Sequence, residues 1–269
     1  MFKRSVNIRR IHKSKKEELE DVVLIEKPLD IIVNAEPLVN IICLPKDLKE
    51  LAIGFLYSIG IINSITDIKQ IKVDDLEYRI TIDLIEKVGF KVEDLDLSPT
   101  SRVIDTTCGI PSPWRKQIKK GLDNGEKSLR AENDIKIQSD LIFNSIKRMQ
   151  IETPLYRETG GCHGAAIFNF KGELIGCKED IGRHNAIDKV IGEMLLKNQL
   201  FEDKFLTSTG RLTGDCVLKA LRAGIPIVAS LSAAIESGIR LAFAYGITLI
   251  GFVRGSRMNI YTNPNRIVI

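Results

Sequence analysis

The feature that most constrains the fold is an alternation of short apolar runs with amphipathic segments in residues 205–253. Three apolar runs, FLTS, IPIVAS and ITLIGFV, are separated by two stretches with helical spacing, GDCVLKALRA and ESGIRLAFAY. Apolar strands that alternate with helices pair in parallel, and their crossover connections are right-handed. The second half of the chain is therefore predicted to be an α/β layer structure.

Further patterns extend this prediction toward the middle of the chain. Residues 139–150, SDLIFNSIKRMQ, have the apolar spacing of an amphipathic helix, and the runs AAIFNF and ELIGC predict strands that turn at Lys171-Gly172. The loop KEDIGRH then leads into a helix over NAIDKVIGEMLL. The pattern thus predicts one continuous α/β unit from residue 139 onward.

The first half of the chain predicts a smaller α+β unit. Residues 21–44 are typical of strands, and residues 68–85 predict a strand pair. Between them, residues 46–62 have helical spacing, with Asp47 as a candidate N-cap and Gly60 as a candidate stop. The basic N-terminus before these elements is expected to be solvated and frayed.

The middle of the chain, residues 86–135, shows no regular pattern and is interrupted by glycines and prolines. Long irregular segments in compact proteins are usually functional or disordered. We therefore expect two domains, 1–135 and 136–269. The first would carry a mobile cysteine loop at about residues 98–120.

Composition limits the location and the partners. No apolar run of the 269-residue chain approaches the roughly 20 residues that span a bilayer. The basic start lacks the apolar stretch of a secretory signal, so we expect a cytoplasmic protein without a membrane partner. A net charge of +4 is too small to predict nucleic-acid binding. Five scattered cysteines do not form a disulfide framework.

One cysteine differs from the others. Cys108 lies in DTTCGIPSPW, residues 105–114, where two prolines exclude regular structure, whereas the apolar surroundings of Cys43, Cys177 and Cys216 predict buried side chains. Basic residues follow it, and their charge favours a thiolate. The segment therefore suits a covalent sulfur carrier. The chain's single tryptophan, Trp114, is either a docking handle for a partner or a clamp for this segment.

Three glycine-containing loops follow predicted strands in the second half, at residues 179–184, 208–211 and 252–257. Ligands of open α/β sheets bind beyond the carboxyl ends of strands, and helix N-termini and arginines bind phosphate. Each loop alone is explained by turn glycines, or by Asp180 as an N-cap. Together they predict a pocket for a phosphorylated or nucleotide-bearing ligand.

The stretch TGGCHGA raises the question of a metal. A zinc deaminase needs H-x-E and P-C-x-x-C, but Ala165 stands two residues after His163 and no P-C-x-x-C occurs. Cys162 and His163 would point to opposite faces of a strand. We therefore predict no protein-bound metal, and His163 is either a ligand contact or a core residue.

The runs TGGCHGAA, EDIGRHNAIDK, STGRLTGDCVLKALRAGIPIVAS and GITLIGFVRGSRMNIYTNP resemble the FdhD family of formate dehydrogenase accessory sulfurtransferases. The resemblance implies a homodimer whose second half has a cytidine-deaminase-like, three-layer fold without zinc. It implies that a cysteine desulfurase loads a persulfide on the protein. That sulfur would then reach the molybdenum (or tungsten) bis(molybdopterin guanine dinucleotide) cofactor of formate dehydrogenase.

The resemblance also assigns residues. Cys108 matches the persulfide-bearing first cysteine of the family's C-x-x-C loop, and a six-residue segment matches the cofactor-binding one. That segment is Phe252, Val253, Arg254, Gly255, Ser256 and Arg257. Further expected cofactor contacts are His163, Asp180, Arg183, His184, Gly210 and Arg211.

Departures from the family pattern leave alternatives open. Pro111 replaces the second loop cysteine, so an outside thiol or Cys162 would have to clear the persulfide. The chain could instead be a cofactor-binding chaperone that transfers no sulfur. A weaker alternative is a metal-dependent hydrolase that uses His163, Glu179 and His184.

Overall fold

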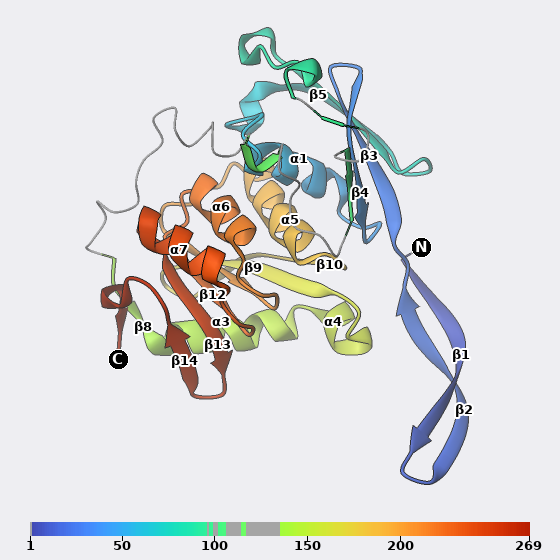
Figure 1. Ribbon diagram of the computed structural model, residues 1–269, viewed down its shortest axis with the longest axis vertical. Helices are drawn as coiled ribbons and strands as arrows, with labels where there is room; N and C mark the ends of the chain where they lie inside the picture. Colours follow the sequence, from blue (N-terminus) through green and yellow to red (C-terminus); the bar gives the residue numbers. More distant parts are fainter. Residues whose placement is uncertain (1, 96, 99–101, 106–113, 117–134) are drawn as a thin grey trace.

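The computed structural model describes residues 2–95, 97–98, 102–105, 114–116 and 135–269 (Figure 1). Its central element is a six-stranded sheet in the order β10-β9-β11-β12-β13-β14. Strands β11, β12 and β13 pair in parallel, as predicted, while β9 is antiparallel to both neighbours. The bounds are His163–Asn169 (β9), Leu174–Asp180 (β10), Lys204–Ser208 (β11), Ile227–Ser230 (β12), Thr248–Arg254 (β13) and Arg257–Ile260 (β14).

Helices cover both faces of this sheet and complete three layers. On one face α3 buries Ile142 and Met149 against Phe168. The adjacent Ile167 points to the other face and joins the core beneath α5 and α6, as alternation along a strand requires. The helices are Ser139–Ile151 (α3), Pro154–Thr159 (α4), Arg183–Leu196 (α5), Gly214–Arg222 (α6) and Glu236–Tyr245 (α7). The predicted helices and strands of this half are confirmed.

The first half forms a five-stranded sheet in the order β5-β6-β3-β4-β7, with α1 packed on it. Gly60, at φ +79°, follows α1 as predicted. Asp47 precedes α1 but makes no side-chain cap; its carboxylate accepts a hydrogen bond from Lys178 Nζ at 3.1 Å instead. The elements are Lys27–Val33 (β3), Glu36–Cys43 (β4), Leu48–Ser58 (α1), Ile68–Asp74 (β5), Arg79–Leu84 (β6) and Val103–Ile104 (β7).

Short elements complete the described chain. Two strands, Ile137–Gln138 (β8) and Ile267–Val268 (β15), pair in parallel near the C-terminus. The 3-10 turns are Ile65–Asp67, Glu86–Val88, Val92–Asp94 and Pro264–Arg266. None of the helices in the described ranges is long and apolar enough to cross a membrane.

The basic N-terminus is a β-hairpin, so the prediction of a frayed end is wrong. Strands β1 (Lys3–His12) and β2 (Lys15–Leu24) pair over their full length, and the hairpin extends away from the body in Figure 1. Opposite charges face each other across the two strands, as in the 2.6 Å ion pair between Arg9 and Glu18. Lys3 binds Glu158 of α4 at 2.9 Å, which fixes the base of the hairpin to the body.

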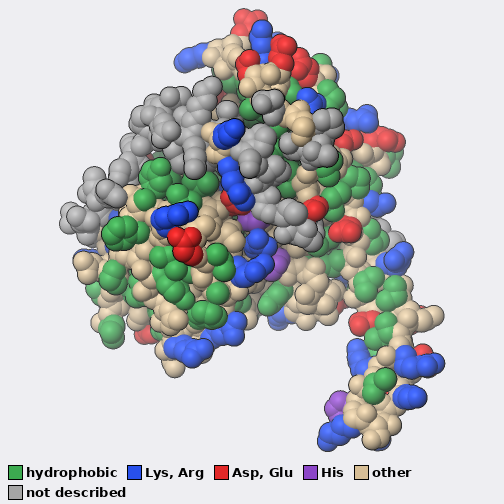
Figure 2. All heavy atoms as spheres, viewed as in Figure 1, with side chains coloured by type: hydrophobic (Ala, Val, Ile, Leu, Met, Phe, Trp, Pro, Cys, Tyr) green, Lys and Arg blue, Asp and Glu red, His purple; other side chains and the backbone are tan. Residues whose placement is uncertain are grey.

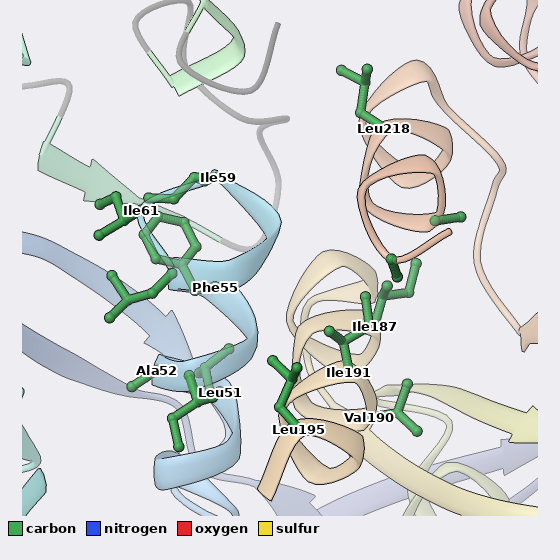
Figure 3. Close-up of a cluster of buried hydrophobic side chains, with 14 of the residues drawn as sticks. Leu51, Ala52, Phe55, Ile59, Ile61, Ile187, Val190, Ile191, Leu195 and Leu218 are labelled. Atoms are coloured by element: carbon green, nitrogen blue, oxygen red, sulfur yellow. The ribbon is translucent and has the colours of Figure 1, made fainter. Parts of the chain in front are cut away.

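The two halves share one hydrophobic core, because α1 lies directly on α5. A Cβ atom at Gly54 would lie 1.8 Å from the carbonyl oxygen of Asp188, and one at Gly192 would lie 2.0 Å from that of Glu50. Leu51 of α1 and Ile191 of α5 belong to the continuous core around this contact (Figure 3). The predicted domain boundary between residues 135 and 136 stays a prediction. Helices from the two sides of this boundary pack on each other in one core.

We expect Gly54→Ala to lower the free energy of unfolding by about 3 kcal/mol or more, because its methyl group would overlap backbone that has no room to move. Urea denaturation would measure the change. The control is Gly161→Ala, where the nearest atom would lie at 3.4 Å. Equal stability of the two variants would contradict the close packing of α1 on α5.

Candidate functional site

The predicted ligand loops gather at one edge of the six-stranded sheet. Because β9 runs antiparallel to its neighbours, its first residue lies where β10 and β11 end: His163 pairs with Asp180, and Ala165 with Ser208. The carboxyl ends of β12 and β13 lie at the same edge. The topology thus brings together residues separated by almost a hundred positions in the chain.

His163 lies over the end of β11. Its Nδ1 is 3.1 Å from Oγ1 of Thr209, and the same oxygen accepts a hydrogen bond from the backbone N–H of Gly164 at 3.1 Å. Beside it, Gly210 makes room for Arg183: a Cβ atom at residue 210 would lie 2.7 Å from Cβ of Arg183. The glycine predicted as a ligand contact therefore also sets the position of an arginine.

His184 lies in the first turn of α5, with Nε2 at 3.3 Å from Oγ1 of Thr213 at the start of α6. Burial, followed by the charge of Arg183, holds the pKa of His184 well below its usual range. Burial and Arg183 also lower the pKa of His163. Both imidazoles are therefore neutral at pH 7, and the positive charge of this edge comes from arginines such as the exposed Arg211.

Asp180 supports the edge from beneath. It is completely buried, and its carboxylate pairs with Lys189 at 2.6 Å. It also accepts hydrogen bonds from the backbone N–H groups of Leu44 at 3.1 Å and Gly182 at 2.8 Å. Asp180 therefore fixes the loop that begins α5 and joins it to the end of β4.

Cys162 and Glu179 face away from His163, as the alternation of side chains predicted. Oε1 of Glu179 accepts a hydrogen bond from the backbone N–H of Tyr156 at 2.8 Å and lies 3.8 Å from Sγ of Cys162. Burial, with the nearby carboxylate, raises the pKa of the Cys162 thiol to about 12. A buried, protonated thiol cannot readily accept a persulfide sulfur, which disfavours Cys162 as the resolving group.

No metal centre forms within the described ranges, where no three His, Cys, Asp or Glu side chains converge. Three cysteines were predicted to be buried. Cys43 and Cys216 are buried, whereas Cys177 is only half-buried. Cys108 lies outside the described residues.

The segment 252–257 lies farther along the same edge, at the turn between β13 and β14. Phe252 and Gly255 have φ values of +52° and +60°, and Nε of Arg254 donates to the carbonyl oxygen of Leu231 at 2.9 Å. Arg254 and Gly255 border a cavity of about 320 Å³ that reaches α3; Phe143, Lys147, Gln150 and Tyr156 also line it. The predicted contacts thus divide between two places on one edge.

The sequence did not predict how residues 114–116 are held. Trp114 is completely buried, with its ring edge-on to Phe55 at 5.5 Å, so it is the clamp and not a docking handle. Arg115 forms two hydrogen bonds to Asp215, at 2.9 and 3.1 Å. Asp215 thus holds on α6 one of the basic side chains that follow Cys108 in the sequence. A lone tryptophan beside prolines was the only signal for this anchor.

These features define a mixed α/β protein with several sheets and a cation-lined edge suited to an anionic ligand. Residues 24–268 match the model of the FdhD/NarQ family, and the chain belongs to that family. The "Sulfur carrier protein FdhD" of Sulfolobus acidocaldarius is 36% identical over 98% of both chains, and that of Bacillus subtilis is 35% identical over 93% of this chain and 92% of its own. The predicted family is confirmed.

The fold has a counterpart among solved structures. The crystal structure of a candidate formate dehydrogenase accessory protein from Desulfotalea psychrophila superposes with a TM-score of 0.78 and 29% identity, covering both chains completely. The arrangement of sheets and helices described above is thus shared across the whole length of that protein.

The buried His184 predicts a pH dependence of stability. Its pKa is lower in the folded protein than in the unfolded chain, so below about pH 6.5 the unfolded chain binds more protons and the folded state loses stability as the pH falls. We expect His184→Gln to reduce this loss by up to about 1.4 kcal/mol per pH unit. Urea denaturation between pH 5 and 8 would measure it. His12→Gln, on the exposed hairpin, should behave like wild type.

Proposed function

We propose that this protein is a sulfur carrier for formate dehydrogenase maturation. Cys108 would accept sulfur from a cysteine desulfurase and pass it to the molybdenum (or tungsten) bis(molybdopterin guanine dinucleotide) cofactor, which is the substrate. The proposal is supported by family membership and by the names of the curated relatives. Its structural support is the cationic edge of the six-stranded sheet.

The described residues that precede and follow Cys108 in the chain lie close to this edge. Ile104, the last residue of β7, pairs with Ile41, and the next residue of β4, Ile42, accepts a hydrogen bond at 2.9 Å from Asn185 in the first turn of α5. On the other side of Cys108 along the chain, Arg115 binds Asp215 in the first turn of α6, at the same edge. This convergence carries the proposal.

The edge suits the phosphates of the substrate. The N-termini of α5 and α6 present backbone N–H groups there, and Arg183 and Arg211 add fork-shaped donors. Neutral imidazoles at His163 and His184 donate or accept hydrogen bonds without adding charge. A nucleotide part of the substrate would occupy the cavity beside Arg254, where aromatic and cationic side chains meet.

Sulfur transfer to the carrier is a thiol exchange. The Cys108 thiolate attacks the outer sulfur of the desulfurase persulfide, that S–S bond breaks, and the desulfurase cysteine leaves as a thiolate. With Pro111 in place of a second loop cysteine and Cys162 buried, an outside thiol clears any persulfide that is not delivered. The proposal includes a cytoplasmic homodimer. It also includes a cytidine-deaminase-like fold for the second half, which is supported by its three layers of helices and sheet.

Loading by the desulfurase tests the carrier role. After incubation with a cysteine desulfurase and cysteine, mass spectrometry should find one added sulfur atom, located on Cys108. Cys108→Ser should abolish both the added sulfur and the recovery of formate dehydrogenase activity, whereas Cys177→Ser, at a half-buried thiol, should retain both. Full recovery of the dehydrogenase by Cys108→Ser would refute the carrier role.

The second candidate function is a cofactor-binding chaperone. It is favoured because Pro111 stands where the family has its second loop cysteine, whereas a cavity for a ligand is present beside Arg254. Under either function, Arg254→Ala combined with Arg257→Ala should weaken the binding of guanosine diphosphate by about tenfold or more, since each arginine offers charge-assisted hydrogen bonds. Isothermal titration calorimetry would measure this. Arg240→Ala, on exposed α7, is the control. Unchanged affinity in the double variant would rule out this binding segment.

A further inference from the structure

Residues 114–116 are a short described segment that is fixed at two points. The indole of Trp114 is completely buried and packs edge-on against Phe55 of α1. The next side chain, Arg115, reaches α6 and pairs with Asp215 through both carboxylate oxygens. The backbone at this segment is therefore held between two helices of the body.

The ion pair is asymmetric in its exposure. The Asp215 side chain is 8% exposed and that of Arg115 is 48% exposed. Asp215 binds two of the five N–H donors of the guanidinium, Nε–H and one on Nη2, and no acceptor among the described residues takes the other three donors of this half-exposed side chain. A fixed, half-exposed arginine is the form in which proteins present a guanidinium to phosphate.

This guanidinium lies beside the cationic edge. Asp215 follows Thr213 by two residues in the first turn of α6, and Oγ1 of Thr213 is 3.3 Å from Nε2 of His184. The charge of Arg115 contributes to the lowered pKa of His184, after the larger effects of burial, Arg183 and Lys219. In Figure 2, Lys or Arg side chains and His side chains gather in the middle of the visible face.

Nearby, one donor lacks a partner. Nε of Arg183 is buried and has no hydrogen-bond acceptor within the described part of the chain. Arg183 lies one residue before His184, and the charges of Arg183 and Arg115 both lower the pKa of this imidazole, so both arginines lie near it. A site with two arginines near neutral imidazoles fits a ligand with adjacent phosphate groups.

We infer that Arg115 is a further anion-binding residue of this site, presented by the Trp114 anchor, oriented by Asp215, and directed at a diphosphate group. The inference rests on the proposed function in assuming a phosphorylated ligand. It adds a contact from the first half of the chain to a site otherwise built from the second half. Ligand binding would then join the two halves of the chain next to residue 114, the last residue of the stretch DTTCGIPSPW.

Calorimetric titration with inorganic diphosphate at low ionic strength tests this. Arg115→Ala should weaken binding by about tenfold or more, which corresponds to one lost charge-assisted contact. The matched control is Lys116→Ala, which removes the same charge from the adjacent exposed residue and should change the affinity by less than about twofold. Arg115→Lys, which keeps the charge but not the fork, should lie between them.

A double variant separates binding from repulsion. Arg115→Ala removes this cation from the buried Asp215 carboxylate, whose negative charge could then repel an anion. If Arg115 binds the ligand, Arg115→Ala with Asp215→Ala stays about tenfold weaker than wild type; recovery of wild-type affinity overturns the inference. Emission of Trp114, the only tryptophan, reports whether each variant keeps the anchor.

The remaining outcomes are also decisive. Equal weakening by Arg115→Ala and Lys116→Ala would reduce Arg115 to a general charge and overturn the inference, while the sulfur-carrier function would stand. Absence of diphosphate binding by the wild-type protein would overturn both this inference and the phosphate site of the proposed function. Of the proposed function, only the loading of sulfur on Cys108 would then remain.

Discussion

The backbone contact between α1 and α5 is the constraint on which the rest of the structure depends. Once the helices touch at Gly54 and Gly192, Oγ of Ser58 donates to Asp188 at 2.6 Å, and Lys219 of α6 binds the same buried carboxylate at 2.6 Å. Leaving one member of a buried charge pair alone costs about 3–5 kcal/mol. The three helices are therefore held in one arrangement, and the first half cannot move independently of the second.

That arrangement determines the electrostatics of the sheet edge. The buried carboxylate of Asp180 is paired with Lys189, which also donates to the carbonyl oxygen of Leu44, so the ends of β10 and β4 are joined by satisfied charges. Above them, burial keeps His163 and His184 neutral while the arginines keep their charge. Under the proposed function, an anionic substrate would meet donors that are already in position.

Much of the fold was accessible from local patterns. The alternation in residues 205–253 predicted three parallel strands, and the spacing in residues 139–150 predicted α3. The hairpin of residues 3–24 was missed because its strands are rich in charges, which normally indicate solvated chain. The two strands are joined by a backbone ladder and face each other with opposite charges, which only the register reveals. Asp47 was misjudged because its carboxylate is recruited by Lys178, 131 positions away.

The sequence by itself determined the family and the order of strands and helices in residues 205–253, because these follow from local periodicity and from motifs in adjacent positions. Only the tertiary structure decided which residues lie together. It divided the predicted contacts between two places, turned Cys162 and Asp180 inward, and brought Arg115 to Asp215. The physical reason is that helix packing and sheet order, which join residues a hundred positions apart, are not encoded in any single stretch of chain.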